Sequence, residues 1–195
     1  MSDLRDWFEN WAYGKPSKDP VMNHDDLILQ LAEHLKHEES FIPYVYDDAY
    51  VGAPPYGSRP KRGTPTIGYG HAIKRGESFT TLTEPEAFDL LIRDIKAHMA
   101  PVIPRVRVPL ALKQWIMLMS HAFNAGPGTV TRSKYFELIN NGGSLDAIRR
   151  DFLSYDKGRV NGKLVVMGGL TKRRAKEWQM FADAVAYNDP KIAIA

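Results

Sequence analysis

Residues 36–48, KHEESFIPYVYDD, join the end of a predicted helix to a predicted strand, and an acidic pair stands at each end. The helix is predicted because leucines recur at every fourth residue upstream and form one buried stripe: Leu27, Leu31 and Leu35. One more step of four reaches Glu39, whereas Glu38 points about 100° away. We therefore expect Glu39, not Glu38, to face a cleft, where burial favours the protonated carboxyl that a general acid needs.

The other acidic pair ends a strand-like run, YVYDD, in which Asp47 and Asp48 have opposite parity. A Gly- and Pro-rich segment then predicts a loop over residues 49–63. In the following TPTIGYGHAI, a continuous strand would place a hydroxyl and two glycines on one face: Thr66, Gly68 and Gly70. Such a face has no bulk, so another element or a ligand is expected to approach the backbone closely.

From about residue 83 the chain is predicted to be helical. Thr83 and Glu86 form a capping-box pattern at the start of the first of these helices. Residues 111–126 are apolar almost all round, which is typical of a central buried helix. Two short amphipathic helices are predicted over residues 133–143 and 145–155. A hairpin with an Asn-Gly turn is predicted over residues 158–166, and a last helix, capped by Thr171, over residues 170–186.

Composition limits the kinds of chemistry. The chain has 195 residues, 44% hydrophobic and 25% charged, and no cysteine, which excludes disulfides, thiolate catalysis and Cys-based zinc sites. No apolar run is long enough to cross a membrane, and we expect no secretory signal. Residues 1–48 carry 11 acidic and 4 basic residues, whereas the rest carry 12 and 22. This basic body is either a solvated surface or suits an anionic partner such as nucleic acid, a membrane surface or wall polymer.

Glu39, Asp48 and Thr66 together suit cleavage of a glycosidic bond. The glutamic acid would protonate the leaving oxygen, the aspartate would stabilise the oxocarbenium-like centre or activate water, and the hydroxyl would hold that water. The spacing of the two acids alone is a weak signal, because it occurs often by chance. No cluster of His, Asp and Glu has the spacing of a metal site, so we expect no metal and no cofactor.

Four motifs in this order, EESFIPYVYDD, TIGYGHAI, AFNAGPG and GLTKRRAKE, resemble the phage-type lysozymes, the endolysin muramidases of glycoside hydrolase family 24. The resemblance covers roughly residues 24–185. It implies that Glu39, Asp48 and Thr66 are catalytic, and its register selects Asp48 over Asp47. Two departures stand out: Ser40 replaces the glycine that usually follows the glutamate, and the loop after Asp48 is longer than in short family members.

The resemblance also implies roles for other residues. His71 and Asp94 would form a structural pair. Arg173 and Arg174 match an arginine pair that either touches the anionic wall or pairs with acids in the core. Expected substrate contacts are two glycines that leave room for a sugar, two residues that match the cleft floor, and an aromatic of the long loop: Gly68, Gly70, Phe123, Asn124 and Tyr56.

The implied fold is α+β, lysozyme-like and mostly helical. A small lobe with a three-stranded antiparallel sheet (about residues 40–82) and a larger helical lobe (about 83–185) would border the cleft, with the helix at about 85–99 linking them. Residues 1–22 would be an N-terminal extension holding a short aromatic helix over residues 4–11 and a linker. Residues 186–195 would be a C-terminal tail.

The implied activity is that of a lysozyme, hydrolysis of the β-1,4 bond between N-acetylmuramic acid and N-acetylglucosamine in bacterial peptidoglycan, by an inverting route. We expect a monomer without nucleic-acid binding or membrane insertion. It would stay in the cytoplasm of an infected host cell until a holin-type protein releases it to the periplasmic peptidoglycan. Three alternatives stay open: a lytic transglycosylase, a non-hydrolytic wall-binding protein of the virion and, least favoured because no nucleic-acid motif is present, a nucleic-acid module.

Overall fold

The computed structural model describes residues 21–48, 63–160 and 162–194. The predicted helix over residues 4–11, most of the long loop and Tyr56 lie outside the described residues. The chain divides into two compact units. Of the described residues, those between 25 and 98 form a small unit, and those between 99 and 194 form a helical unit together with residues 21–24. The small unit thus includes two helices as well as the sheet, and its boundary falls later in the chain than the predicted lobe boundary near residue 83.

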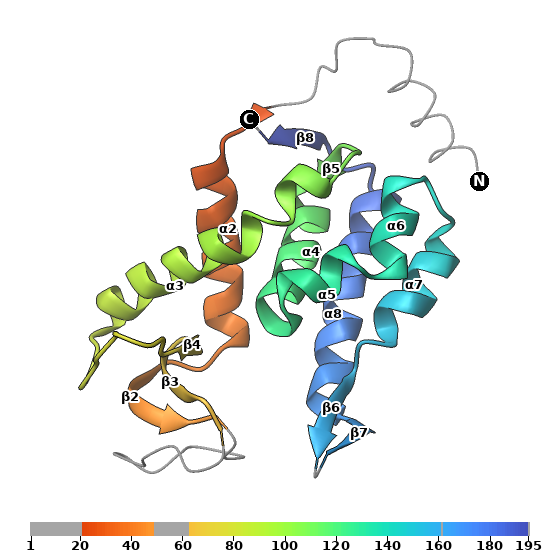
Figure 1. Cartoon of the computed structure of the whole chain (residues 1–195). Helices are drawn as coiled ribbons and strands as arrows, with labels where there is room; N and C mark the ends of the chain where they lie inside the picture. The colour runs from red at the N-terminus through yellow and green to blue at the C-terminus, as the bar shows by residue number, and fades with distance from the viewer. Residues whose placement is uncertain (1–20, 49–62, 161, 195) are drawn as a thin grey trace. The chain divides into compact units, whose positions relative to one another are not determined.

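The small unit is built from two long helices and a three-stranded sheet (Figure 1). All three leucines of the predicted stripe are buried in it. The strands pair antiparallel in the order β2-β3-β4, which confirms the predicted three-stranded antiparallel sheet. The elements are α2 (His24–Glu38), β2 (Ile42–Asp47), β3 (Pro65–Gly68), β4 (His71–Ala72) and α3 (Glu84–Met99).

Ion pairs at both ends show that α2 and α3 run antiparallel. Lys36, in the last turn of α2, lies 3.4 Å from Glu84 at the start of α3, and Lys96 in the last turn of α3 lies 3.3 Å from Asp25 in the first turn of α2. The predicted capping box opens α3. The backbone N–H and the hydroxyl of Thr83 donate to Glu86, and these bonds lower the pKa of that carboxyl.

The TPTIGYGHAI segment is not one continuous strand, which corrects our prediction. It folds back as β3, a tight turn at residues 69–70, and β4, with Ile67 opposite His71. Gly68 (φ 67°) and Gly70 (φ 84°) adopt the left-handed conformation that this reversal requires and that other residues rarely accept. The two glycines therefore do not continue a single strand face shared with Thr66.

The helical unit surrounds α4 (Leu112–Ala125), which is buried through most of its length, as predicted. The last helix begins earlier than predicted. Thr171 does not cap it but lies inside it, where its hydroxyl donates to Met167 and Asp156. The other elements of this part of the unit are η1 (Ile103–Arg105), α5 (Pro127–Thr131), α6 (Lys134–Asn140), α7 (Leu145–Leu153), the hairpin strands β6 (Lys157–Val160) and β7 (Lys163–Val166), and α8 (Gly168–Ala186).

A second three-stranded sheet joins distant parts of the helical unit, in the order β1-β8-β5. The predicted tail supplies β8 (Lys191–Ile194), which pairs parallel with β1 (Val21–Met22) and antiparallel with β5 (Leu110–Ala111). Strands as short as these three, with no turn motif joining them to their partners, carry too little alternation to be predicted from sequence. Only the pairing of distant segments gives them their conformation.

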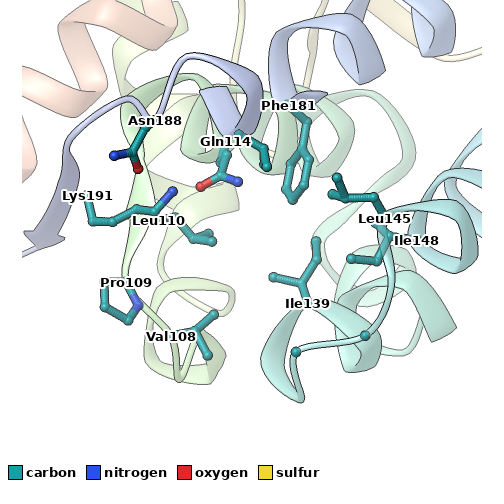
Figure 2. A pocket seen from close by; sticks show the side chains of 13 residues that line it. Val108, Pro109, Leu110, Gln114, Ile139, Leu145, Ile148, Phe181, Asn188 and Lys191 are labelled. Carbon is teal, nitrogen blue, oxygen red and sulfur yellow. The ribbon is translucent and has the colours of Figure 1, made fainter. Parts of the chain in front are cut away.

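The helical unit encloses a small apolar cavity of about 70 Å³ (Figure 2). Ile139, Ile148 and Phe181 face it, and Asn188 and Lys191 lie together on one side. Binding sites for small molecules are typically several hundred Å³. None of the described residues that the sequence predicts to act on substrate lines this cavity, so we interpret it as a packing void.

Candidate active site

Glu39 directly follows the last residue of α2 and continues its backbone bonding. Its amide donates to the carbonyl of Leu35 at 2.8 Å, so the helical phase inferred from the leucine stripe extends to this residue. Burial, however, does not separate the two glutamates, because Glu38 and Glu39 are both partly exposed. Glu39 stands at the end of the stripe and is more exposed than the buried leucines that precede it.

Asp47 and Asp48 differ sharply in exposure at the end of β2. Asp47 is 1% exposed, whereas Asp48 is exposed. The amide of Thr64 donates to Asp48 Oδ1 at 2.6 Å, and the Asp48 amide donates back to the Thr64 carbonyl at 3.2 Å. This reciprocal pair holds the Asp48 carboxylate beside the start of β3, on the solvent side of the sheet.

Thr66 is buried in β3, and its hydroxyl is oriented by the same residue that holds Asp48. Thr66 Oγ1 donates to the carbonyl of Thr64 at 3.0 Å. A hydroxyl has one donor and two acceptor sites. With its proton committed to Thr64, Thr66 Oγ1 can only accept a hydrogen bond from a further group, such as a water molecule.

Tyr46 is related to each of the three candidate catalytic residues, by strand pairing to one and by charge to the other two. It lies opposite Thr66 in the pairing of β2 with β3. Burial raises the pKa of Tyr46, and the negative charges of Glu39 and Asp48 raise this pKa further. Both carboxylates therefore act electrostatically on the phenol of the residue that is paired with Thr66.

The two glycines of the hairpin have different surroundings. A Cβ atom added to Gly68 would lie 3.3 Å from the Cβ of Ala87, so Gly68 allows α3 to pack against β3. A Cβ added to Gly70 would instead lie 3.8 Å from Glu39 Oε2, and Gly70 is exposed. Of the two glycines expected to contact substrate, Gly70 borders the candidate acid, whereas Gly68 is buried under a helix.

His71 pairs with Asp94, and with a second acid that the sequence did not indicate. Its Nδ1 lies 2.7 Å from Asp94 Oδ2, and its Nε2 lies 2.8 Å from Glu77 Oε2. Only a doubly protonated imidazole can donate to both. Glu77 also accepts from the Lys74 amide, and this bond and the His71 contact lower the pKa of Glu77. The bridged ring ties β4 to α3.

Phe123 and Asn124 lie near the C-terminal end of α4 in the helical unit. Phe123 is partly exposed, and Asn124 is exposed. Arg174 Nη2 donates to Asn124 Oδ1 at 3.1 Å. An amide whose oxygen accepts from arginine presents its NH2 group as the remaining donor. Arg174 thus orients Asn124, and no local sequence pattern connects these two residues.

Arg173 and Arg174 pair with an acid of α8, in agreement with one of the two alternatives left open by the sequence. Arg174 is fully buried, and its Nε lies 2.9 Å from Glu177 Oε2. Arg173 Nε donates to Glu177 Oε1 at 3.2 Å, and Ser120 of α4 donates to the same oxygen at 2.6 Å. Burial raises the pKa of Glu177, and the two arginines oppose this effect.

Across residues 21–48, 63–160 and 162–194, no three or more His, Asp and Glu side chains are grouped as metal ligands would be. Every helix in the same ranges is too short or too polar to cross a lipid bilayer.

Comparison with known sequences places these residues in a family context. The model of the phage lysozyme family matches residues 36–177, which include Glu39, Asp48 and Thr66. An endolysin of Acyrthosiphon pisum secondary endosymbiont phage 1 is 32% identical over 126 residues, which are 64% of this chain and 84% of that protein.

Solved structures have the same fold. An endolysin from Escherichia coli O157:H7 phage FAHEc1 superposes with a TM-score of 0.67 at 24% identity, over 80% of this chain and 92% of that one. At this identity the similarity establishes the fold alone. A P22 lysozyme variant superposes with a TM-score of 0.59 at 27% identity, over 78% of this chain and 95% of that one. The predicted lysozyme-like α+β fold is therefore confirmed.

Proposed function

The chain belongs to the phage lysozyme family, and on that premise we propose how its residues cleave peptidoglycan. It is a lysozyme-type glycoside hydrolase of the endolysin kind, and its substrate is the bacterial cell wall. The bond that we propose is the β-1,4 linkage between N-acetylmuramic acid and N-acetylglucosamine. The observation that supports the mechanism is that the charges of Glu39 and Asp48 both act on Tyr46, which lies opposite Thr66 in the sheet.

Glu39 is the proposed general acid, and its proton goes to the oxygen of the scissile glycosidic bond. As that bond breaks, a water molecule attacks the anomeric carbon from the opposite face of the sugar and loses one proton to Asp48. The reaction leaves a new hydroxyl on each fragment. Displacement of the leaving group by water in one step inverts the anomeric centre.

The hydrogen bonds of Asp48 and Thr66 suit the handling of that water. Thr66 donates its own proton to Thr64, so it can accept one O–H of the water while Asp48 accepts the other. Thr64 holds the Asp48 carboxylate through a 2.6 Å bond, so both acceptors are fixed to the same residue of the sheet. A pre-oriented pair of acceptors lowers the entropic cost of placing the nucleophile.

Residues outside this trio have proposed supporting roles. Gly70 leaves space beside Glu39, and the NH2 group of Asn124 is a donor for the substrate. Phe123 and Tyr56 are further proposed contacts. His71 and Asp94 are proposed to hold the sheet in place for the catalytic residues. We assign this activity to a catalytic domain spanning residues 23–185.

The biological setting is also part of the proposal. The protein would accumulate as a monomer in the cytoplasm of an infected cell and reach the wall once a holin-type protein opens the membrane. A net charge of +3, with the basic excess in residues 49–195, favours attraction to an anionic wall.

The test is digestion of purified sacculi by wild type, Glu39→Gln and the matched neighbour Glu38→Gln. Loss of general acid catalysis costs about 10²–10⁴ in rate. We expect that loss for Glu39→Gln and near-normal rates for Glu38→Gln, with unchanged melting temperatures for both. Mass spectrometry should find reducing N-acetylmuramic acid ends. Predominant 1,6-anhydro ends would instead identify a lytic transglycosylase, and equal lysis by the two variants would remove Glu39 from the mechanism.

A further inference from the structure

The β6–β7 hairpin gathers most of the exposed apolar surface of the described chain. Among the described residues, seven large hydrophobic side chains are exposed, and five of them lie between residues 160 and 167. Leu164 is the most exposed of these five, at 63%. The five are Val160, Leu164, Val165, Val166 and Met167. Contiguous apolar patches on a protein surface are typical of interaction sites, whereas single exposed residues need no explanation.

The strand pairing sets cations beside these aliphatic residues. Arg159 lies opposite Leu164, and Lys157 lies opposite Val166, so these two pairs share one face of the ribbon. On the other face Lys163 lies opposite Val160. Residues 157–167, KGRVNGKLVVM, contain three cations, no acid, no aromatic ring and no hydroxyl. Both faces therefore combine positive charge with aliphatic surface.

The hairpin gains little burial from the rest of its unit. Every residue of β7 is exposed, and so are all residues of β6 except Gly158, which is partly exposed. A two-stranded ribbon is at best marginally stable in water without packing against a further surface. A partner that covers the ribbon would supply that burial. The exposed side chains of the hairpin determine what chemistry such a partner must have.

From this combination we infer that the β6–β7 hairpin docks on the surface of an anionic phospholipid bilayer. Cations attract anionic headgroups, and aliphatic side chains enter the boundary between headgroups and acyl chains. A glycan presents hydroxyls and ring C–H groups, which polar and aromatic side chains would match better. The inference concerns adsorption at the surface and goes beyond the proposed hydrolytic function. Docking would hold the enzyme where the membrane faces the wall.

The test is co-sedimentation of the full chain with two kinds of vesicle, phosphatidylcholine alone and phosphatidylcholine with one third phosphatidylglycerol. We expect binding to the anionic vesicles, weakened by added salt. Each cation near an anionic surface contributes about 1 kcal/mol, so Lys157→Gln combined with Arg159→Gln should weaken binding about thirtyfold. Leu164→Ser combined with Val166→Ser should also weaken binding.

Leu29→Ser is the matched control, because Leu29 is similarly exposed, at 49%, but lies alone on α2. It should bind the vesicles as wild type does. All variants should digest solubilised wall fragments at the wild-type rate, so the outcome does not depend on the catalytic proposal. Failure of wild type to bind anionic vesicles would overturn the inference. Vesicle binding by the hairpin variants equal to that of wild type would also overturn it. If the hairpin variants lost binding to purified sacculi but not to vesicles, the surface would be assigned to the glycan.

Discussion

Two acids of the small unit and one acid of the helical unit lie in opposite environments. In the small unit, Glu39 and Asp48 stand at the surface, at the two ends of the segment that leads from α2 through β2. In the helical unit, Glu177 is 1% exposed and contacts two arginines and Ser120. A buried carboxylate needs such partners because desolvation of an unpaired charge is costly. A carboxylate that must meet a substrate has to remain accessible instead.

Asp47 and Asp48 show the same contrast between a buried and an exposed carboxylate at the end of one strand. We expect Asp48→Asn to reduce the rate of wall digestion by about 10²-fold or more, since the amide cannot accept the proton of the attacking water. Its free energy of unfolding should change little. Asp47→Asn should retain the activity of each folded molecule but lose about 1–3 kcal/mol of stability, because its carboxylate is buried.

Urea unfolding and digestion of sacculi on the same preparations measure both quantities. If Asp47→Asn lost activity without losing stability, Asp47 and not Asp48 would have the catalytic role, and the expectation would be wrong.

In the helical unit, removal of one partner of a buried ion pair is expected to reduce stability, because the remaining charge stays desolvated. Arg174→Met leaves Glu177 buried without its closest cation and should cost about 3–5 kcal/mol. The matched double variant Arg174→Met with Glu177→Met removes both charges and should be less destabilised than the single variant. Thermal and urea unfolding test this order. If the double variant were as unstable as the sum of the two single variants, the residues would contribute independently and not as an ion pair.

The smallest expected effect is a pH dependence in the small unit. Hydrogen bonds lower the pKa of Glu77, Glu84 and Glu86 from the ordinary value of 4.5. A carboxyl whose folded pKa is lowered stabilises the fold above its unfolded pKa, and this stability is lost as pH falls through the folded value. The free energy of unfolding should therefore decline as pH falls below about 4.5.

Glu86→Gln should flatten part of that decline, and Thr83→Ala, which removes one of the donors to Glu86, should flatten it less. Urea unfolding between neutral and acidic pH provides the measurement. Glu177 should act with the opposite sign, because burial raises its pKa and folding then favours its protonated form. An unchanged slope in Glu86→Gln would show that this carboxyl is not coupled to folding.

Local patterns were sufficient for much of the fold. The leucine stripe predicted α2 and the helical phase that Glu39 continues. The capping box predicted the start of α3, and the apolar run predicted α4. Each of these signals involves residues within one or two helical turns, where the chain's own periodicity decides the outcome. Resemblance of motifs, and not periodicity, selected Asp48 and Thr66.

Contacts between distant residues decided the rest. The sequence did not indicate that Glu77 would join His71, that Arg174 would orient Asn124, or that residues 191–194 would form a strand between two others. Each of these depends on segments brought together by folding, and no local pattern encodes such an approach. Thus the sequence by itself determined which residues are candidates for the chemistry. Only the tertiary structure decided that Thr66 lies opposite Tyr46, on which the charges of Glu39 and Asp48 both act, because this requires the turn from α2 into β2 and the pairing of β2 with β3.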